Sequence, residues 1–334
     1  MHPVLFPFGS EERWISFLSH WVTSDEHELE IAKLLVRKNI LPLVHGSELA
    51  YILGISPKLL THMAKRPAKY YRTFTIPKKT GKPRQITAPR IFLKVVQRYI
   101  LDCVLRPLPV HVAACGFVAG RNCGSGAALH VGRRYVWNID LKDFFPSVSQ
   151  ERVRLLFSHI GYPQRAAKFL SEICCLDERL PQGAPTSPMI SNLVFVECDS
   201  EIVACARTNN VAYTRYADDL TFSSGEPFSD AFMNAVRSSI KKHGFRINER
   251  KTRLMGSMCR REVTGLTVNE KVSIPRYRRR QLRALFHQVE LNPAKFQPQK
   301  RVVIGFASWV HDYHEEGKGY LKLAHSIPDP ESRA

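Results

Sequence analysis

The sequence has no apolar run approaching the roughly 18–20 residues that a membrane-spanning helix needs, so we expect no association with a membrane. Its first seven residues lack the basic start and long apolar core of a secretory signal, which favours a cytoplasmic protein. No internal repeat or low-complexity tract is present, which argues against a solenoid. Because 44% of the residues are apolar, the chain can bury a core, and disorder is excluded.

Paired cysteines are also missing. None of the eight cysteines forms a CxxC pair, so the spacing fits neither a zinc ribbon nor a thioredoxin-type redox site. Reduced and mostly buried thiols are the expectation.

Acidic residues are scarce in two stretches of the chain. Residues 65–98 contain eleven Lys and Arg and no Asp or Glu, and residues 241–301 contain seventeen basic residues against four acidic ones. Residues 1–46, by contrast, hold four basic and six acidic residues. The formal charge of +19 is therefore concentrated in two basic regions. A solvated surface is best served by interspersed signs, so we predict that a polyanion such as a nucleic acid binds between the two regions.

Hydrophobic periodicity predicts a mixed α+β fold. In the first half, we expect helices within 1–46, a short helix over 47–53 ending at Gly54, a hairpin of strands 71–77 and 84–89, and a helix over 90–105. In the second half, we expect strands over 135–141, 212–216, 220–223, 246–248 and 263–268. We also expect a helix that follows the strand 135–141 and runs through 157, a helix over 228–243, and a basic helical region from 277 to the end.

Three aspartates are candidates for metal binding. Asp218 and Asp219 stand at the predicted tip between two apolar strands, and Asp140 stands at the end of another. Adjacent acids in a turn are common, but like charges on a half-buried hairpin repel each other unless a cation neutralises them. Carboxylates from neighbouring strands are ligands that Mg²⁺ prefers, and two such ions can clamp the oxygens of a phosphoryl transfer.

These residues carry a family resemblance. Tyr-Ala-Asp-Asp at 216–219, Ile-Asp-Leu-Lys-Asp-Phe-Phe at 139–145 and Leu-Pro-Gln-Gly-Ala-Pro-Thr-Ser-Pro at 180–188 together resemble the ordered motif set of reverse transcriptases. The resemblance implies a right-hand polymerase fold with a helical N-terminal extension (1–46), fingers and palm (47–262), and a palm-thumb strand with a helical thumb (263–334). It also implies two Mg²⁺ ions bound mainly by Asp140 and Asp218, with Asp219 assisting.

The same resemblance implies a nucleotide pocket. Phe145 would stack beneath the incoming sugar and exclude a 2′-hydroxyl, while Gln182 and Gly183 would support the nucleotide and template base. Arg84, with Lys78 and Lys79, would close on the dNTP triphosphate. Lys251 would lie near the departing pyrophosphate, although a solvated surface lysine is nearly as good an interpretation. Asp143 is expected one turn into a helix, where it caps or pairs.

Two further matches resemble bacterial retron enzymes. Val263-Thr264-Gly265 resembles their VTG triplet, and Ala128-Leu129-His130 resembles the end of their NAxxH element, with Gly126 where the pattern has Asn. A plain strand and a core histidine are the alternatives. The resemblance implies copying of a structured noncoding RNA into single-stranded DNA, primed by the 2′-hydroxyl of an internal guanosine and kept attached to the RNA. It also implies defence against phage with a separate effector protein.

The basic C-terminal region is the candidate RNA-binding surface. Tyr277 could stack on an unpaired base, and its neighbouring arginines could contact the RNA backbone; these are Arg278, Arg279, Arg280 and Arg283. A non-specific clamp on any duplex is the alternative. For the whole chain, the alternatives are another small prokaryotic reverse transcriptase, intron-like or diversity-generating, and a catalytically silent RNA-binding protein on the same scaffold.

Overall fold

The centre of the fold is a four-stranded antiparallel sheet with the strand order β4-β5-β3-β6. The structure is a computed structural model and describes residues 10–77 and 83–329. The sheet strands are β3 (Tyr135–Asp140), β4 (Ala212–Tyr216), β5 (Asp219–Ser224) and β6 (Arg253–Met255). The outer strand β6 is short, so the site is built on the three longer strands.

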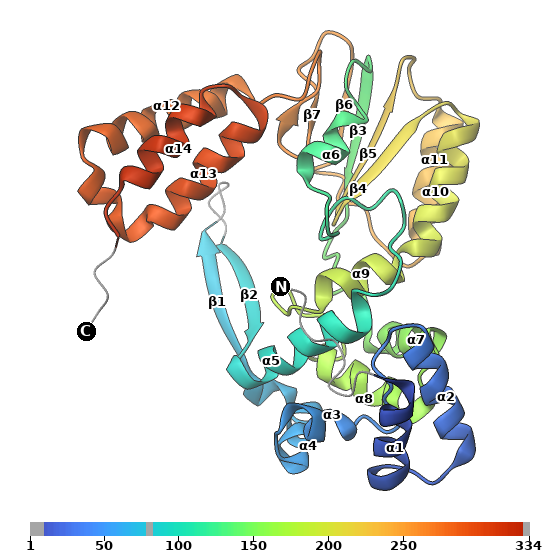
Figure 1. The fold of residues 1–334 in the computed structure, drawn as a ribbon. Helices are drawn as coiled ribbons and strands as arrows, with labels where there is room; N and C mark the ends of the chain where they lie inside the picture. Colours follow the sequence, from blue (N-terminus) through green and yellow to red (C-terminus); the bar gives the residue numbers. More distant parts are fainter. Residues whose placement is uncertain (1–9, 78–82, 330–334) are drawn as a thin grey trace.

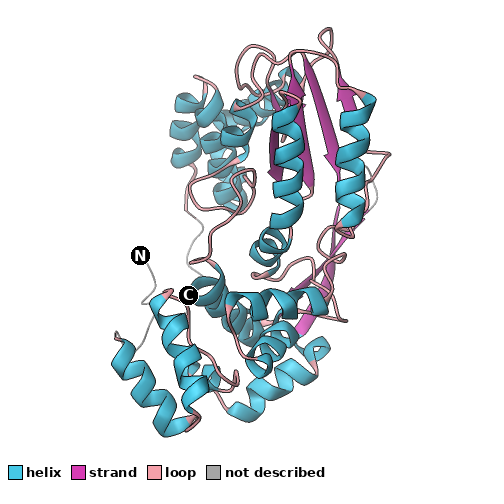
Figure 2. Cartoon of the chain, turned by 90° about the vertical axis from the view of Figure 1, so that its right-hand side faces the viewer, coloured by secondary structure: helices cyan, strands magenta, loops and turns pink. Residues whose placement is uncertain are grey.

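Helices α10 (Val196–Thr208) and α11 (Asp230–Lys242) cover one face of this sheet (Figure 1). Trp137 of β3 packs on Phe222 of β5 and Phe232 of α11, with ring centroids 5.2 and 6.3 Å apart. Figure 2 shows the two helices lying along the strands. The short helix α6 (Cys123–Ala128) contacts β4, and His130, just after it, bonds to the opposite sheet face. One face is thus closed by long helices, and the other is only partly covered.

A long hairpin projects from a helical base (Figure 1). Its strands are β1 (Tyr71–Pro77) and β2 (Pro83–Pro89), which pair in register from Tyr71 with Pro89 to Pro77 with Pro83. The surrounding helices are α3 (Glu48–Leu53), α4 (Pro57–Lys65), the 3₁₀ turn η1 (Pro67–Tyr70), α5 (Ile91–Ile100), the π-helical turn η2 (Leu101–Leu105), α7 (Gln150–Ile160), α8 (Gln164–Cys174) and α9 (Ser187–Val194).

The N-terminal helices α1 (Glu11–Trp21) and α2 (Glu26–Arg37) pack against this helical base. Trp14 and Leu35 belong to the same buried cluster as α5, α7 and α8, and the hydroxyl of Tyr162 donates a hydrogen bond to the Leu41 carbonyl at 2.6 Å. Residues 10–46 therefore share a core with the rest of the chain. Their role as a separate extension stays a prediction.

The C-terminal region forms a helical bundle with a core of its own. It contains α12 (Arg276–Leu291), the 3₁₀ segment η3 (Pro293–Gln299), α13 (Lys300–Tyr313) and α14 (Gly317–Ser326). The ring of Phe286 in α12 stacks on Tyr320 of α14 with centroids 4.0 Å apart, so the apolar face of α12 points into the bundle. The bundle core continues into the small hairpin of β7 (Glu262–Val263) and β8 (Leu266–Thr267).

Most predicted elements are confirmed, including the mixed α+β class, but three predictions are wrong. Residues 246–248 make only a single bridge, through Ile247 to Leu141, and the fourth strand is 253–255. The predicted strand 263–268 is a tight hairpin, because Thr264 and Gly265 have positive φ angles of 48° and 80°. The helix after β3 begins only at Gln150, and Asp143 lies in a turn with a φ of 50°.

Candidate active site

The antiparallel register of β3 and β5 places Asp140 directly opposite Asp219. Asp218 lies on the turn that joins β4 to β5, directly before Asp219, and its carbonyl accepts a hydrogen bond from the Leu141 amide at 2.9 Å. The residue before it, Ala217, has a φ of 56°, an unusual left-handed conformation for a residue with a side chain. Strand pairing and one strained turn therefore bring together the three aspartates that the sequence predicts to bind metal.

Asp140 is held by two side chains from the segment that follows α11. Its Oδ1 accepts a bond from Asn248 Nδ2 at 2.9 Å, and its Oδ2 lies 2.7 Å from Lys251 Nζ. The Asp140 carbonyl also accepts a bond from the Asn248 amide at 2.8 Å. Lys251 is thus paired with the site and is not a free surface lysine.

The environment of Asp218 and Asp219 favours their neutral forms. Desolvation in this part of the fold, the adjacent Asp218 carboxylate and the facing Asp140 carboxylate together raise the pKa of Asp219 to about 7. Burial also raises the pKa of Asp218, and the positive charges of Lys251 and Arg84 oppose this shift. Because Asp219 is exposed to solvent, a dissolved cation can reach its carboxylate and neutralise the repulsion among the aspartates.

A cavity of about 620 Å³ opens beside these carboxylates. Its lining includes Asp140, Asp219 and Lys251, together with Thr264 and Gly265 of the β7–β8 turn. The Thr264 hydroxyl donates to the Cys123 carbonyl at 3.0 Å, which anchors that turn to α6. Val263 is fully buried, so only its two neighbours in the VTG triplet face the cavity.

Aromatic rings from the motif segments pack on one another. Phe145 is half-buried between Phe144 and Phe117, with ring centroids 5.6 and 6.4 Å away. Phe144 is 4% exposed, which confirms that it belongs to the core. The ring centroid of Phe117 also lies 6.2 Å from that of Tyr216, so Phe117 contacts both Phe145 and Tyr216. The sequence reasoning missed Phe117.

The Gln182-Gly183 loop docks on the β1–β2 hairpin. The Thr87 amide of β2 donates to the Gln182 carbonyl at 3.0 Å. A Cβ on Gly183 would lie 2.8 Å from the Thr87 carbonyl oxygen, and the φ of Gly183 is 140°, so glycine is required by the close approach of β2. Arg84 is exposed on the same strand. Lys78 and Lys79 lie outside the described residues.

The arginines predicted to bind RNA are not equally available. Arg279 Nη1 lies 2.9 Å from His314 Nε2, and Arg283 forms an ion pair of 2.7 Å with Glu316, so both contact the loop between α13 and α14. Arg278 lies over the Phe306 ring at 5.4 Å. Arg280 is exposed. The ring of Tyr277 is half-exposed, and the Arg260 guanidinium lies over it, 5.2 Å from the ring centroid.

The donor set fits a hard cation. Two carboxylates face each other across paired strands, a third adjoins them, and the Lys251 ammonium already occupies one position on Asp140. Within 10–77 and 83–329, however, no group of three or more His, Cys, Asp or Glu side chains is arranged closely enough to hold a metal by itself. Substrate oxygens and water would have to complete the coordination of any ion bound here.

Other motif residues have structural explanations. His130 is fully buried between the hydroxyls of Ser223 and Thr214, at 2.7 and 2.8 Å, and burial lowers its pKa to about 4. It is the core histidine of the alternative interpretation. Asp143 pairs with Arg246 at 3.8 Å on the surface. The sequence reasoning also missed Asn248, for which its place three residues before Lys251 was the only signal.

The fold and site are those of a template-copying polymerase of the palm type, and comparisons with known proteins agree. Residues 76–301 match the family described as "Reverse transcriptase (RNA-dependent DNA polymerase)", which fits a right-hand polymerase fold. The retron Mx65 and Mx162 reverse transcriptases of Myxococcus xanthus are 39% and 34% identical, over 72% and 91% of this chain and 62% and 72% of theirs. The retron Ec86 reverse transcriptase of Escherichia coli is 36% identical over 66% of this chain and 70% of its own length.

The chain belongs to the bacterial retron reverse transcriptases, a family of RNA-directed DNA polymerases. It spans less than two thirds of the Mx65 protein. A solved apo telomerase from Candida tropicalis, truncated from its C-terminal domain, is 13% identical with a TM-score of 0.41 over 66% of this chain and 61% of that chain, a likeness too low to carry an inference. In the part of the chain that the structure describes, no helix combines the length and the apolar character needed to cross a bilayer.

Proposed function

We propose that this chain polymerises DNA on an RNA template at the cavity lined by Asp140 and Asp219, with Asp218 on the adjoining turn. The observation that carries the proposal is the facing pair Asp140 and Asp219, with Asp218 on the adjoining turn and repulsion among all three. Two bound Mg²⁺ ions would neutralise this repulsion and stabilise the charge that develops on the transferred phosphoryl group.

We propose roles for the remaining predicted site residues as well. Asn248 and Lys251 orient the two oxygens of Asp140, and Lys251 brings a positive charge to the place where pyrophosphate would leave. Arg84 and the hairpin lysines Lys78 and Lys79 would bind the triphosphate, and Gln182 and Gly183 would support the nucleotide from the loop docked on β2. Phe145 would contact the sugar and exclude a ribose.

We further propose that the template is a structured noncoding RNA made with the protein in the cytoplasm. Thr264 and Gly265 face the same cavity as the aspartates, so an RNA held at the VTG turn would place a nearby 2′-hydroxyl at the site. The product would be single-stranded DNA joined to an internal guanosine. Tyr277 and the arginines at 278–280 and 283 would bind RNA beside it, and a separate effector protein would complete an antiphage system.

The test is to purify the protein with its bound nucleic acid from cells that express its natural locus. RNA with a covalently attached DNA copy, sequenced through the branch, supports the proposal, and the Asp218→Asn protein should carry the same RNA without DNA. RNA alone on the wild-type protein would indicate a silent RNA-binding protein. DNA copied from an unrelated RNA would indicate another kind of small prokaryotic reverse transcriptase.

A further inference from the structure

Behind the catalytic turn lies a charged pair with no contact with solvent. Arg215 of β4 and Asp199 of α10 are both 0% exposed. The guanidinium donates from Nε and Nη2 to the Asp199 carboxylate, at 3.0 and 2.7 Å, and stacks over the Phe195 ring at 4.6 Å. Asp199 also accepts a bond from the Tyr213 hydroxyl at 2.7 Å. A charge pair buried this completely is costly to desolvate, so it is weak evidence for stability alone.

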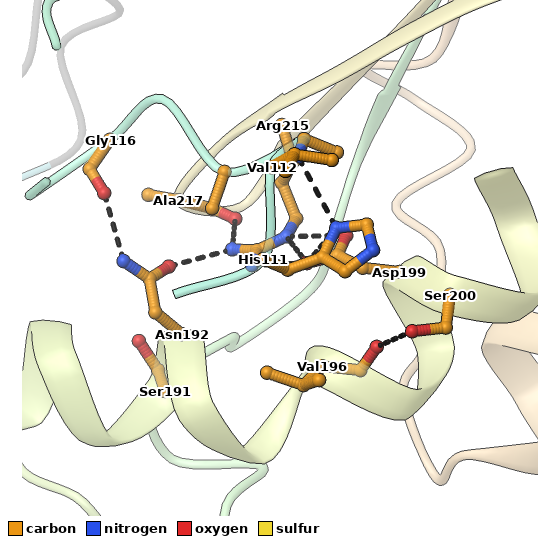
Figure 3. A network of polar contacts seen from close by, with 12 residues as sticks. His111, Val112, Gly116, Ser191, Asn192, Val196, Asp199, Ser200, Arg215 and Ala217 are labelled. Atoms are coloured by element: carbon orange, nitrogen blue, oxygen red, sulfur yellow. Dashed lines mark hydrogen bonds and ion pairs between the residues drawn. The ribbon is translucent and has the colours of Figure 1, made fainter. Parts of the chain in front are cut away.

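The third nitrogen of Arg215 reaches the catalytic turn (Figure 3). Its Nη1 donates to the Asn192 side-chain oxygen at 2.9 Å and to the Ala217 carbonyl at 3.2 Å. Ala217 is the residue with the left-handed φ, directly before Asp218. Such a conformation is unfavourable for a residue with a Cβ and persists only where its surroundings fix it.

A second layer fixes the turn from the side. Asn192 Nδ2 donates to the Gly116 carbonyl at 2.9 Å, and the amide of Cys115 donates to the Arg215 carbonyl at 2.7 Å. A Cβ on Gly116 would lie 2.8 Å from the Ala217 amide nitrogen, so the backbone at 116 presses directly on the turn. The turn is therefore held by one side-chain network and one close backbone contact.

The network is separate from the residues that face the cavity. Side chains alternate along a strand, so Tyr213 and Arg215 point toward α10 while Thr214 bonds to His130 and Tyr216 lines the cavity on the other side. Arg215 consequently cannot contact substrate, and its action on Asp218 passes through the Ala217 carbonyl.

We propose that Arg215 is a positioning residue that holds the Ala217–Asp218 turn in its left-handed form, so that Asp218 and Asp219 face Asp140 before any cation or nucleotide binds. Asp199 and Asn192 fix the direction of the guanidinium. The proposal rests on the proposed function only for its consequence in polymerisation; the positioning itself is a property of the free protein.

The test uses hydrogen exchange of the metal-free protein. The Leu141 amide donates to the Asp218 carbonyl and reports whether the turn is closed, whereas the Val153 amide in α7, which donates to Ser149, reports on a distant helix. In Arg215→Lys, which keeps the charge but loses the planar fork, Leu141 should exchange at least about tenfold faster, and Val153 should not change. Equal acceleration of both amides, or none at Leu141, would overturn the proposal.

Two more variants keep the experiment decisive. Asn192→Ala removes a neutral partner and should show the same local effect, more weakly, if Arg215→Lys does not fold. Glu48→Gln is the matched control: this carboxylate in α3 is also 0% exposed and accepts the Val44 and His45 amides, at 2.7 and 2.8 Å, but touches no part of the turn. It should leave the Leu141 to Val153 exchange ratio unchanged.

Primer extension separates positioning from lost stability. In Arg215→Lys, the Mg²⁺ concentration for half-maximal extension should rise severalfold, because misplaced carboxylates bind the ion less well. A protein that is only less stable has fewer active molecules and an unchanged Mg²⁺ requirement. If the wild-type protein extends no primer, the proposed function fails, while the exchange result still decides the role of Arg215.

Discussion

The two sides of the β4–β5 hairpin carry charge in opposite ways. Toward α10, Arg215 and Asp199 are fully buried, and each charge is matched by its partner and by further hydrogen bonds. Toward the cavity, Asp218 and Asp219 repel each other and Asp140. Among the described residues, Lys251 is the only cation within salt-bridge distance of these three carboxylates.

The difference shows how one short hairpin can be both stable and reactive. The side that faces α10 and carries Arg215, here called the closed side, fixes the backbone. The side that faces the cavity and carries Asp219, here called the open side, keeps a negative charge that a metal ion or a phosphate-bound cation can neutralise. Functional sites commonly hold such unfavourable charge, and the surrounding fold supplies the stability that the site gives up. Four experiments test this difference between the two sides of the hairpin.

The largest effect should come from the open side. Asp218→Asn should lower dNTP incorporation by roughly 10³-fold or more, because removing one carboxylate from a metal-dependent transfer costs about 4 kcal/mol of transition-state stabilisation. Primer extension measures the loss, and a melting curve checks the fold. The control is Asp143→Asn, in which a surface acid paired with Arg246 is neutralised without touching the cavity. Retained extension in Asp218→Asn would remove Asp218 from the metal site.

On the closed side, the same chemical change should act on stability. Asp199→Asn leaves the Arg215 charge buried without its carboxylate, and we expect it to lower the free energy of unfolding by about 3–5 kcal/mol. Chemical denaturation measures the change. Asp143→Asn again serves as control and should cost less than about 1 kcal/mol, because exposed ion pairs contribute little. Similar losses of unfolding free energy in Asp199→Asn and Asp143→Asn would show that the buried charge pair does not stabilise the closed side.

Shape selection should belong to the open side alone. Phe145→Val should raise ribonucleotide use relative to dNTP use roughly tenfold, because the ring packed between Phe117 and Phe144 no longer fills the space near the sugar. Competition assays with matched nucleotides give the ratio. Tyr213→Phe, an aromatic change on the closed side, should leave that ratio as it is. A folded Phe145→Val protein with unchanged discrimination would show that another residue excludes ribose.

The smallest effect concerns pH. The pKa of Asp219 is raised to about 7 in the folded protein, so the folded state holds a proton that the unfolded state releases near its ordinary value of 3.8. Without divalent ions, the wild type should therefore lose stability relative to Asp219→Asn as the pH rises from about 4 through 7, and the difference should then level off. Denaturation midpoints across this range measure it. A difference that is constant with pH would mean that Asp219 is not destabilised.

Much of the site was predictable because short-range patterns determine it. Alternating apolar residues around Asp140 and the Tyr-Ala-Asp-Asp turn predict paired strands, and the register of that pairing brings the acids together. The strand 253–255 was missed because Arg253, Leu254 and Met255 show no alternation, and their pairing depends on the neighbouring β3.

The closed side was harder to foresee. Arg215 interrupts an apolar strand, and a charge in that place requires a buried partner, which was the available signal. Its partner Asp199 lies on a helix sixteen residues earlier, and no local pattern connects the two. Arg279 and Arg283 are predicted to contact RNA, and the sequence did not reveal their contacts with the α13–α14 loop, because these depend on how the bundle packs.

The docking of Gly183 on β2 has a mechanical consequence. The Thr87 amide donates a hydrogen bond to the Gln182 carbonyl, and a Cβ at Gly183 would not fit between the two segments. The base of the β1–β2 hairpin is therefore fixed to the loop that precedes α9. Any bending of the hairpin that keeps this bond must pivot beyond Thr87, in the stretch that carries Arg84. A movement of this kind would displace the part of β2 from Pro83 to Ile86, while the helical base stays in place.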